Sequence, residues 1–279
     1  MTKLSSRLAF AAVIFALFLG AAFGQSGKAV IATQDDIDRD MANVPCKGAD
    51  RLAAAEKLFR SMGAADEDIS YLEKGGIKDL IVTRKGTGTG TITVGAHYDK
   101  VDDGCGAIDN WTGIVAIARL YATLRSVATV KTFKFVAFDK EEKGLLGSDA
   151  LARSIAKEDR PSYCSMVNFD SFGFTQPWVM ENTSDPKMIA DAKELWTTMK
   201  LKLQSVPINN ADADSTSFLH AGIPAITFTG LDSKWQKYLH SNNDKLTNVN
   251  GESVYLGYRF VLPFLTRLDA ASCDAFRKK

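Results

Sequence analysis

Several features that would assign a chain to a special class of protein are missing from this sequence. Its 279 residues include only four cysteines and three histidines, and no Cys-x-x-Cys spacing occurs. A structural zinc site built from thiolates is therefore not expected. Lys and Arg number 34 against 33 Asp and Glu, so the sequence lacks the charge excess that would favour nucleic acid or an anionic membrane as its main partner. Internal repeats and low-complexity linkers are absent as well.

Long apolar runs are also missing, except at the start of the chain. Lys3 and Arg7 precede an uncharged apolar run over residues 8–19, and mostly small residues follow at 20–24. This order is typical of a cleaved secretory signal peptide. A retained anchor is the alternative, but the run is shorter than the roughly 20 residues that cross a bilayer. We expect residues 1–24 to be a signal peptide and the mature chain to be secreted or periplasmic, with no stable membrane association.

The rest of the chain suits one large domain. The sequence is 46% hydrophobic and 24% charged, which are ordinary values for a globular protein with a sizeable core. Its length favours a single domain over residues 25–279. In an oxidising compartment the four cysteines could form up to two disulfides, in any of three pairings. Cys105 lies inside a polar motif, where it could instead be unpaired.

Hydrophobic patterning predicts strands that alternate with helices. Strands are expected at residues 69–72, 77–83, 91–96, 133–138, 163–169, 179–181 and 224–228, and helices within 35–60 and at 112–124, 145–156, 185–199 and from 254 onward. Lys74-Gly75-Gly76 joins the first two strands and is a hairpin signal. The alternation favours an α/β sheet that is parallel in its centre, with the hairpin adding antiparallel edge strands.

Polar clusters follow the predicted strands, where open α/β sheets bind ligands. These clusters contain His97 and Asp99, Asp109, Glu141 and Glu142, Asp170, and His240. Taken alone, Glu141 and Glu142 would form an exposed acidic turn, because adjacent carboxylates are costly to bury without a positive partner. Taken together, the clusters supply enough ligands for two metal ions.

Imidazole and carboxylate ligands suit zinc, and two ions about 3.5–4 Å apart can share a bridging water. In this interpretation His97 and Asp170 hold one ion. Glu142 and His240 hold the other, and Asp109 bridges the two.

Two further acids have expected roles around these ligands. Glu141 is the carboxylate left over, and beside a metal-activated water it would act as the general base. Asp99 would orient the imidazole of His97, as carboxylates often do for zinc-bound histidines. A turn cap is the plainer alternative for Asp99.

Five motifs, in this order, closely resemble the M28 family of zinc-dependent aminopeptidases. They are GAHYD from Gly95, GAIDNWTG from Gly106, EEKGLLGS from Glu141, NFDSFG from Asn168 and HSNND from His240. The resemblance implies that the metal ligands are His97, Asp109, Glu142, Asp170 and His240, that Glu141 is the general base, and that each chain binds two Zn²⁺. It also implies the family's α/β fold, a three-layer sandwich around a mixed, mainly parallel central sheet.

Two positions depart from the family pattern. Within the segment 212–218 the family commonly has His after Asp, and here Ser215 follows Asp214. This puts the substrate contacts of that loop in doubt and leaves the metal ligands untouched. Cys105 stands before Gly106, where the family often has a small residue or proline.

The resemblance implies an exported di-zinc aminopeptidase that hydrolyses the N-terminal bond of peptides with a free N-terminus. A glutaminyl cyclase-like acyltransferase is one alternative, although those similar enzymes use a single zinc and typically lack the histidine of the first motif and the bridging motif. A non-catalytic binding module of the same fold is the other, although such relatives usually lose ligands.

Some side chains near the motifs keep two interpretations. Trp235, Tyr238 and Phe172 could line a pocket for a substrate side chain or lie in the core. Asp244 could match the acid of the family's histidine loop or cap a turn. His220 is expected at the surface end of a helix, with no metal role.

Overall fold

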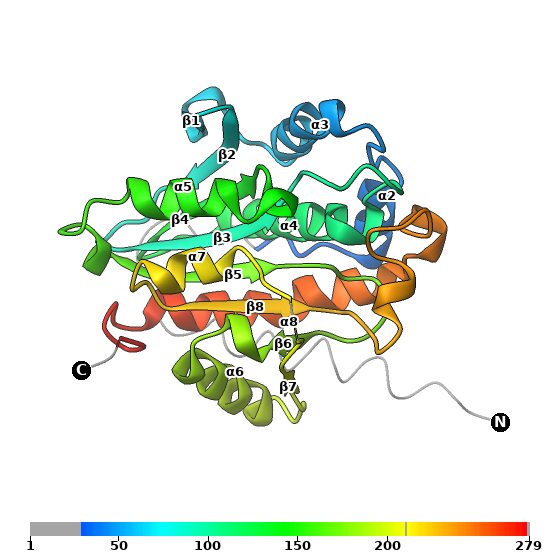
Figure 1. Cartoon of the computed structure of the whole chain (residues 1–279). Coiled ribbons are helices and arrows are strands. Elements are labelled where there is room, and N and C mark those ends of the chain that lie inside the picture. The colour runs from blue at the N-terminus through cyan, green and yellow to red at the C-terminus, as the bar shows by residue number, and fades with distance from the viewer. Residues whose placement is uncertain (1–28, 210, 278–279) are drawn as a thin grey trace.

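The computed structural model describes residues 29–209 and 211–277, and its centre is one mixed sheet of eight strands (Figure 1). The strand order is β1-β2-β4-β3-β5-β8-β6-β7. The strands are β1 (Ile69–Lys74), β2 (Ile77–Arg84), β3 (Thr91–His97), β4 (Thr132–Phe138), β5 (Tyr163–Phe169), β6 (Trp178–Met180), β7 (Ser205–Val206) and β8 (Ala225–Thr229). The expected signal peptide lies outside the described residues.

Strand directions confirm the expected mixture. In the centre, β3 pairs in parallel with β4 and β5, and β5 pairs in parallel with β8. The hairpin β1–β2 joins β4 antiparallel at one edge, and β6 joins β8 antiparallel toward the other. The two-residue strand β7, which the sequence analysis did not predict, pairs in parallel with β6 and ends the sheet.

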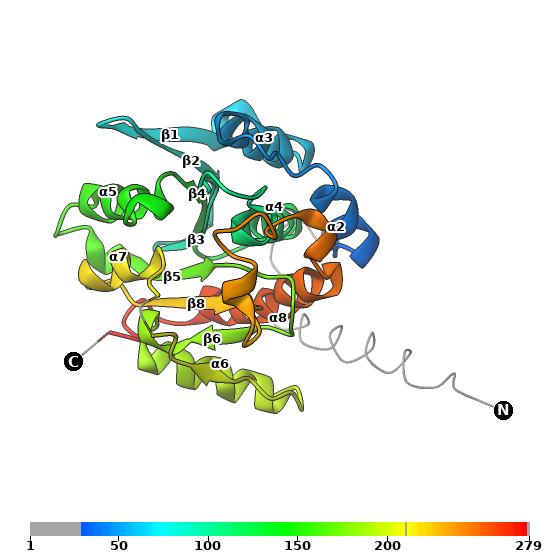
Figure 2. The same cartoon turned by 45° about the vertical axis from the view of Figure 1, so that its right-hand side comes forward.

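Helices cover both faces of the sheet, as Figure 2 shows, so the expected α/β sandwich is confirmed. The helices are α2 (Gln34–Met41), α3 (Gly48–Ser61), α4 (Thr112–Arg125), α5 (Leu146–Ser154), α6 (Pro186–Thr198), α7 (Ser215–His220) and α8 (Gly251–Ala270). One face packs mainly on α4, α6 and α8, and the other on α5 and α7. No helix within residues 29–209 and 211–277 is long and apolar enough to cross a membrane.

Aromatic packing fixes the central strands. Phe133, Phe135 and Phe138 of β4 are fully buried, and each such ring contributes roughly 1.5–3 kcal/mol on burial. Gly95 of β3 makes room for Phe138, because a Cβ there would lie 2.3 Å from that ring. Since β3, β4 and β5 are parallel, their carboxyl ends meet at one edge of the sheet, and the residues that follow them are brought together.

The four cysteines form two disulfides, the largest number that the sequence allowed. Cys46 pairs with Cys105 and Cys164 pairs with Cys273, so the alternative of an unpaired Cys105 is wrong. The first bond ties the segment before α3 to the loop after β3. The second ties the start of β5 to the segment after α8. Disulfides are typical of exported proteins.

Candidate metal centre

The predicted ligands come from five segments that meet at the carboxyl edge of the central strands. His97 is the last residue of β3, and Asp170 directly follows β5. Glu142 lies in a helical turn, Glu141–Lys143, just after β4. Asp109 lies in the loop that leads into α4, and His240 comes from the long loop after β8. The structure therefore brings together side chains that are up to 143 residues apart in sequence.

Asp109 lies between two groups of side chains. Its Oδ1 is 3.0 Å from Nε2 of His97, which is also 3.8 Å from Oδ1 of Asp170. Its Oδ2 is 3.3 Å from Nε2 of His240, which is 3.0 Å from Oε2 of Glu142. One carboxylate thus faces a histidine and an acid on each side.

This donor set fits bound zinc. Two atoms bound to one tetrahedral zinc at about 2.0–2.1 Å lie ~3.3 Å apart, close to the four separations around Asp109. Two groups of three titratable residues are close enough to hold a metal, His97 with Glu141 and Asp170, and His97 with Asp109 and Glu142. Nε2 of His97 and Oε1 of Glu142 are buried without a hydrogen-bond partner in the described structure. A cation between these atoms would satisfy them.

The charges of the site also favour a cation. Burial opposes a positive charge on His97, but the nearby carboxylates, Glu141 foremost, hold the pKa of His97 well above its usual value. Hydrogen bonds to Asp109 and Glu142 raise the pKa of His240 to about 10. Burial would raise the pKa of Asp109, yet the two histidines beside its oxygens lower it. The cluster of acids therefore draws positive charge toward its centre, and a divalent ion would supply it.

Glu141 lies beside the predicted ligands and is half-buried. Burial raises its pKa well above the usual range, with the carboxylates of Asp170 and Asp214 adding to the effect. The turn that carries Glu141 is held by Asp99, whose carboxylate accepts the backbone N–H groups of Glu141 at 3.0 Å and Glu142 at 3.2 Å.

Asp99 also contacts the imidazole of His97. Its Oδ1 lies 3.4 Å from Nδ1 of His97, and its backbone carbonyl lies 3.3 Å from the same nitrogen. Nδ1 therefore faces Asp99 while Nε2 faces Asp109. One carboxylate thus links the histidine to the turn that presents both glutamates.

Asp244 holds the loop that carries Asp109. Its carboxylate accepts the backbone N–H of Ile108 at 2.6 Å and of Asp109 at 3.2 Å, and its carbonyl accepts the N–H of Cys105 at 2.6 Å. The sequence allowed Asp244 to be a simple turn cap, but its carboxylate does more than cap a local turn. It connects the His240 loop to the Asp109 loop.

Arg51 of α3 holds the same loop by hydrogen bonds to its backbone, a role that the sequence analysis did not predict. Its guanidinium is fully buried and donates to the carbonyls of Pro45 at 3.0 Å, Cys105 at 3.0 Å, Gly106 at 3.1 Å, and Tyr98. Burial lowers its pKa to about 10, which leaves it charged at neutral pH. A helical arginine of this kind gives no local signal, because its acceptors come from distant loops.

The loop with the unusual serine closes one side of the site. Asp214 is fully buried, both of its carboxylate oxygens lack a partner in the described structure, and burial raises its pKa to about 8. The hydroxyl of Ser215 donates to the carbonyl of Thr183 at 2.7 Å and lies 2.6 Å from Oγ1 of Thr227. Where the family commonly has histidine, this chain thus has a buried hydroxyl that anchors α7.

A cavity of about 500 Å³ opens over the cluster. Asp109, Glu141, Glu142, Asp170 and His240 line it, and Met180, Ile208, Leu231, Trp235 and Leu239 form its apolar wall. Of the three aromatic residues with two interpretations, only Trp235 lines this cavity. Phe172 is buried in the core and Tyr238 packs on Phe174, with ring centres 4.9 Å apart. His220 is exposed at the end of α7, as expected.

The family model of peptidase family M28 matches residues 79–262, which include every predicted site residue. The chain belongs to peptidase family M28. Among curated M28-like relatives, leupeptin-inactivating enzyme 1 of Streptomyces exfoliatus is 25% identical over 57% of this chain and 41% of its own length. A probable leucine aminopeptidase of Arthroderma otae is 28% identical over 69% of this chain and 57% of its own. This M28 chain thus spans about half the length of these relatives.

Solved structures share the fold. LapA of Legionella pneumophila superposes with a TM-score of 0.75 at 20% identity, over 86% of this chain and 74% of that chain. BSAP, a zinc aminopeptidase from Bacillus subtilis, superposes with a TM-score of 0.63 at 20% identity, over 72% of this chain and 53% of that chain. A glutaminyl cyclase from an Acidobacteriales bacterium superposes with a TM-score of 0.71 at 14% identity, over 89% of this chain and 99% of that chain. The M28 fold therefore carries both kinds of enzyme.

Proposed function

We propose that this M28 chain is a di-zinc aminopeptidase that removes residues from the free N-terminus of peptides. The observation that carries the proposal is the position of Asp109, whose two oxygens face His97 and Asp170 on one side and His240 and Glu142 on the other. These five residues would hold the metal ions. Two zinc ions would polarise the scissile carbonyl and acidify the attacking water.

Glu141 would move the proton. It lines the cavity and its pKa is raised by burial, which makes it a stronger base than an exposed glutamate. It would accept a proton from the attacking water and return it to the leaving amine. Asp99 fixes the Glu141 turn by its backbone, so the carboxylate of Glu141 stays free for this work.

The acids of the cavity also suit the substrate. A free peptide N-terminus is a cation, and Asp212, which lines the cavity and is not a proposed metal ligand, would attract it. The apolar wall of Met180, Leu231 and Trp235 suits an uncharged side chain on the N-terminal residue.

The first prediction concerns Glu141. We expect Glu141→Gln to keep the zinc content of the wild type and to lose roughly a hundredfold or more in kcat on a leucyl arylamide, as for a general base. The matched control is Glu158→Gln, an exposed glutamate, which should leave both values unchanged. Zinc analysis and initial rates measure the two effects. A Glu141→Gln protein that turns over at the wild-type rate would remove Glu141 from this role.

A glutaminyl cyclase is the second candidate, because such an enzyme shares the fold over nearly its whole length. The presence of His97 and Asp109 in pairing distance supports the peptidase instead. Cyclisation of a peptide with N-terminal glutamine, without release of free amino acids, would reverse the ranking. A chain that neither retains nor rebinds zinc would favour a non-catalytic binding module.

Export belongs to the same proposal. Residues 1–24 would be removed as a signal peptide, and the mature domain of residues 25–279 would be secreted or periplasmic. The two disulfides support an oxidising compartment. N-terminal sequencing of protein recovered outside the cytoplasm tests this, and a chain that keeps residues 1–24 there would contradict it.

A further inference from the structure

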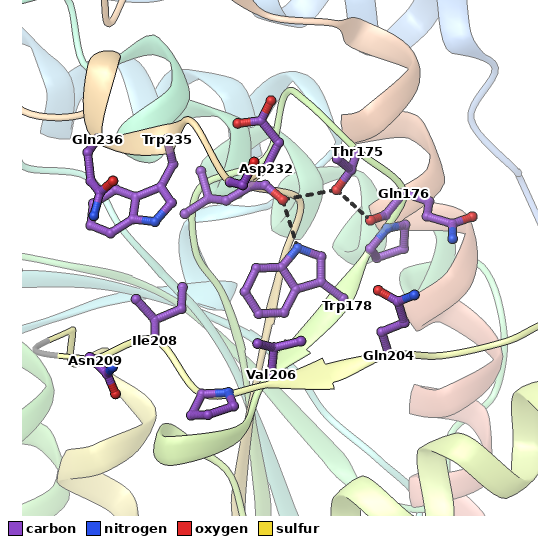
Figure 3. Close-up of a pocket in the computed structure, with 14 residues that line it drawn as sticks. Thr175, Gln176, Trp178, Gln204, Val206, Ile208, Asn209, Asp232, Trp235 and Gln236 are labelled. Carbon is purple, nitrogen blue, oxygen red and sulfur yellow. Dashed lines mark hydrogen bonds between the residues drawn. The ribbon is translucent and has the colours of Figure 1, made fainter.

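A second cavity adjoins the one over the metal centre. It has a volume of about 700 Å³, within the ~300–1,000 Å³ range of ligand pockets. Its lining residues come from three segments, 175–178, 204–209 without Ser205, and 231–236 without Lys234. Ile208, Leu231 and Trp235 line both cavities, so the two share a wall. We call the second cavity the extension groove. Figure 3 shows Val206 and Ile208 on one side of it and Trp235 and Gln236 on another.

The floor of the extension groove is apolar and held in place. Nε1 of Trp178 donates to the carbonyl of Leu231 at 2.8 Å, and Oγ1 of Thr175 donates to the same carbonyl at 3.1 Å (Figure 3). Pro177 and Pro207 stiffen the two flanking segments. Val206 of β7 is 46% exposed, one of few large hydrophobic side chains left open to solvent among the described residues. Val206 is joined in the lining by Ile208, Leu231 and Trp235, and an apolar patch within a groove is typical of a binding site.

The rim of the groove is polar but almost uncharged. Gln176, Gln204, Asn209 and Gln236 supply amide groups, and Asp232 is the one charged side chain among the described residues that line the groove. Amides donate and accept hydrogen bonds, as a peptide backbone does. Grooves with aromatic walls are also a known way to bind extended peptide segments. The lining therefore fits an uncharged stretch of peptide.

The position of the groove identifies which part of a peptide it would take. Nothing precedes the first residue of an aminopeptidase substrate, so only the first side chain or the residues after the scissile bond could enter. The groove is larger than the cavity over the metal centre, and it includes none of the predicted ligands. We propose that the extension groove binds the substrate residues that follow the scissile bond, and that the enzyme therefore favours uncharged peptides of four or more residues over dipeptides. This inference rests on the proposed aminopeptidase function.

The test compares substrates of different length that share their first residue. For the wild type we expect kcat/KM for Leu-Ala-Ala-Ala to exceed that for Leu-Ala by about tenfold. Val206→Glu should lower the tetrapeptide value by about tenfold and leave the leucyl arylamide value within twofold. Val206 lines the groove and not the cavity over the metal centre. The matched control is Val130→Glu, since Val130 is 51% exposed and lines neither cavity.

A peptide with a complementary charge distinguishes a lost contact in the groove from misfolding of the Val206→Glu variant. Val206→Glu should prefer Leu-Ala-Lys-Ala over Leu-Ala-Ala-Ala, whereas the wild type should not. Equal loss on arylamide and tetrapeptide, or no dependence on length in the wild type, would overturn the proposal. A change in preference for the first residue would instead assign the groove to the first side chain.

Failure of the proposed function would be seen separately. If no zinc-dependent release occurs from the arylamide, the aminopeptidase proposal fails. Binding of Leu-Ala-Ala-Ala can then still be followed by tryptophan fluorescence, because Trp178 and Trp235 line the groove. Tighter binding of the tetrapeptide than of Leu-Ala, weakened by Val206→Glu, supports the groove, and equal binding of both peptides by both proteins overturns it.

Discussion

Asp79 is an acid whose burial has a cost that depends on pH. Its side chain is fully buried in β2, Oδ1 accepts the N–H of Asp139 at 2.8 Å, and Oδ2 has no partner in the described structure. Burial raises the pKa of Asp79 from 3.8 to about 7. In the unfolded chain the group ionises near 3.8, so between pH 4 and 7 the folded state binds the extra proton. Stability is therefore lost as pH rises through this window.

The prediction is that Asp79→Asn stabilises the protein at pH 8 and has little effect at pH 4. The amide oxygen keeps the hydrogen bond from Asp139, and the buried charge is gone. A pKa change from 3.8 to about 7 corresponds to on the order of 4 kcal/mol at most. Thermal unfolding of variant and wild type at both pH values measures it. The exposed acid Asp35 provides the control Asp35→Asn. A stabilisation that is the same at pH 4 and pH 8 would contradict this explanation.

At the scale of elements, the loop between β3 and α4 is the part of the site that depends most on distant support. It carries Asp109, and its backbone is held by Arg51 of α3, by Asp244 from the His240 loop, and by the disulfide between Cys46 and Cys105. The other disulfide, between Cys164 and Cys273, holds the opposite, amino-terminal end of β5. The two bonds thus differ in what they position.

This difference gives a prediction for the two disulfides. They close loops of 59 and 109 residues, so the chain-entropy model gives each a similar contribution of roughly 4–5 kcal/mol. We expect the double variants Cys46→Ser/Cys105→Ser and Cys164→Ser/Cys273→Ser to lose comparable stability. Only the first pair should bind zinc more weakly, by about tenfold or more, because it loosens the Asp109 loop. Competition with a zinc chelator measures the affinity, and equal zinc affinity in the two double variants would count against the idea.

At the scale of the whole molecule, the sequence alone predicts the central sheet. It also predicts that the site residues lie together at one edge of that sheet. The strands β3, β4 and β5 were predictable because each is a short apolar run followed by polar residues. The motifs then placed His97, Glu141 and Asp170 at or just after the ends of those strands, and the structure brings ligand atoms of these three residues within 4.8 Å of one another.

Other elements gave no such signal. The strand β7 has only two residues. Only the end of α7 (Ser215–His220) at His220 was expected, because the helix begins with Ser and Thr, which are poor helix formers. Packing of Phe218 against Phe138 holds α7 in place, which is a tertiary effect. The extension groove needs three segments from distant parts of the chain, and burial of Arg51 needs carbonyls from separate loops. Local sequence patterns do not predict such contacts between distant segments.

The measurement that tests the proposed function most directly is a zinc titration of chelated protein while release from a leucyl arylamide is followed. The donor set around Asp109 predicts that activity is absent without metal and reaches its plateau at about two zinc ions per chain. A plateau at one zinc ion would contradict the shared carboxylate, and full activity in the chelated protein would contradict the metal centre itself.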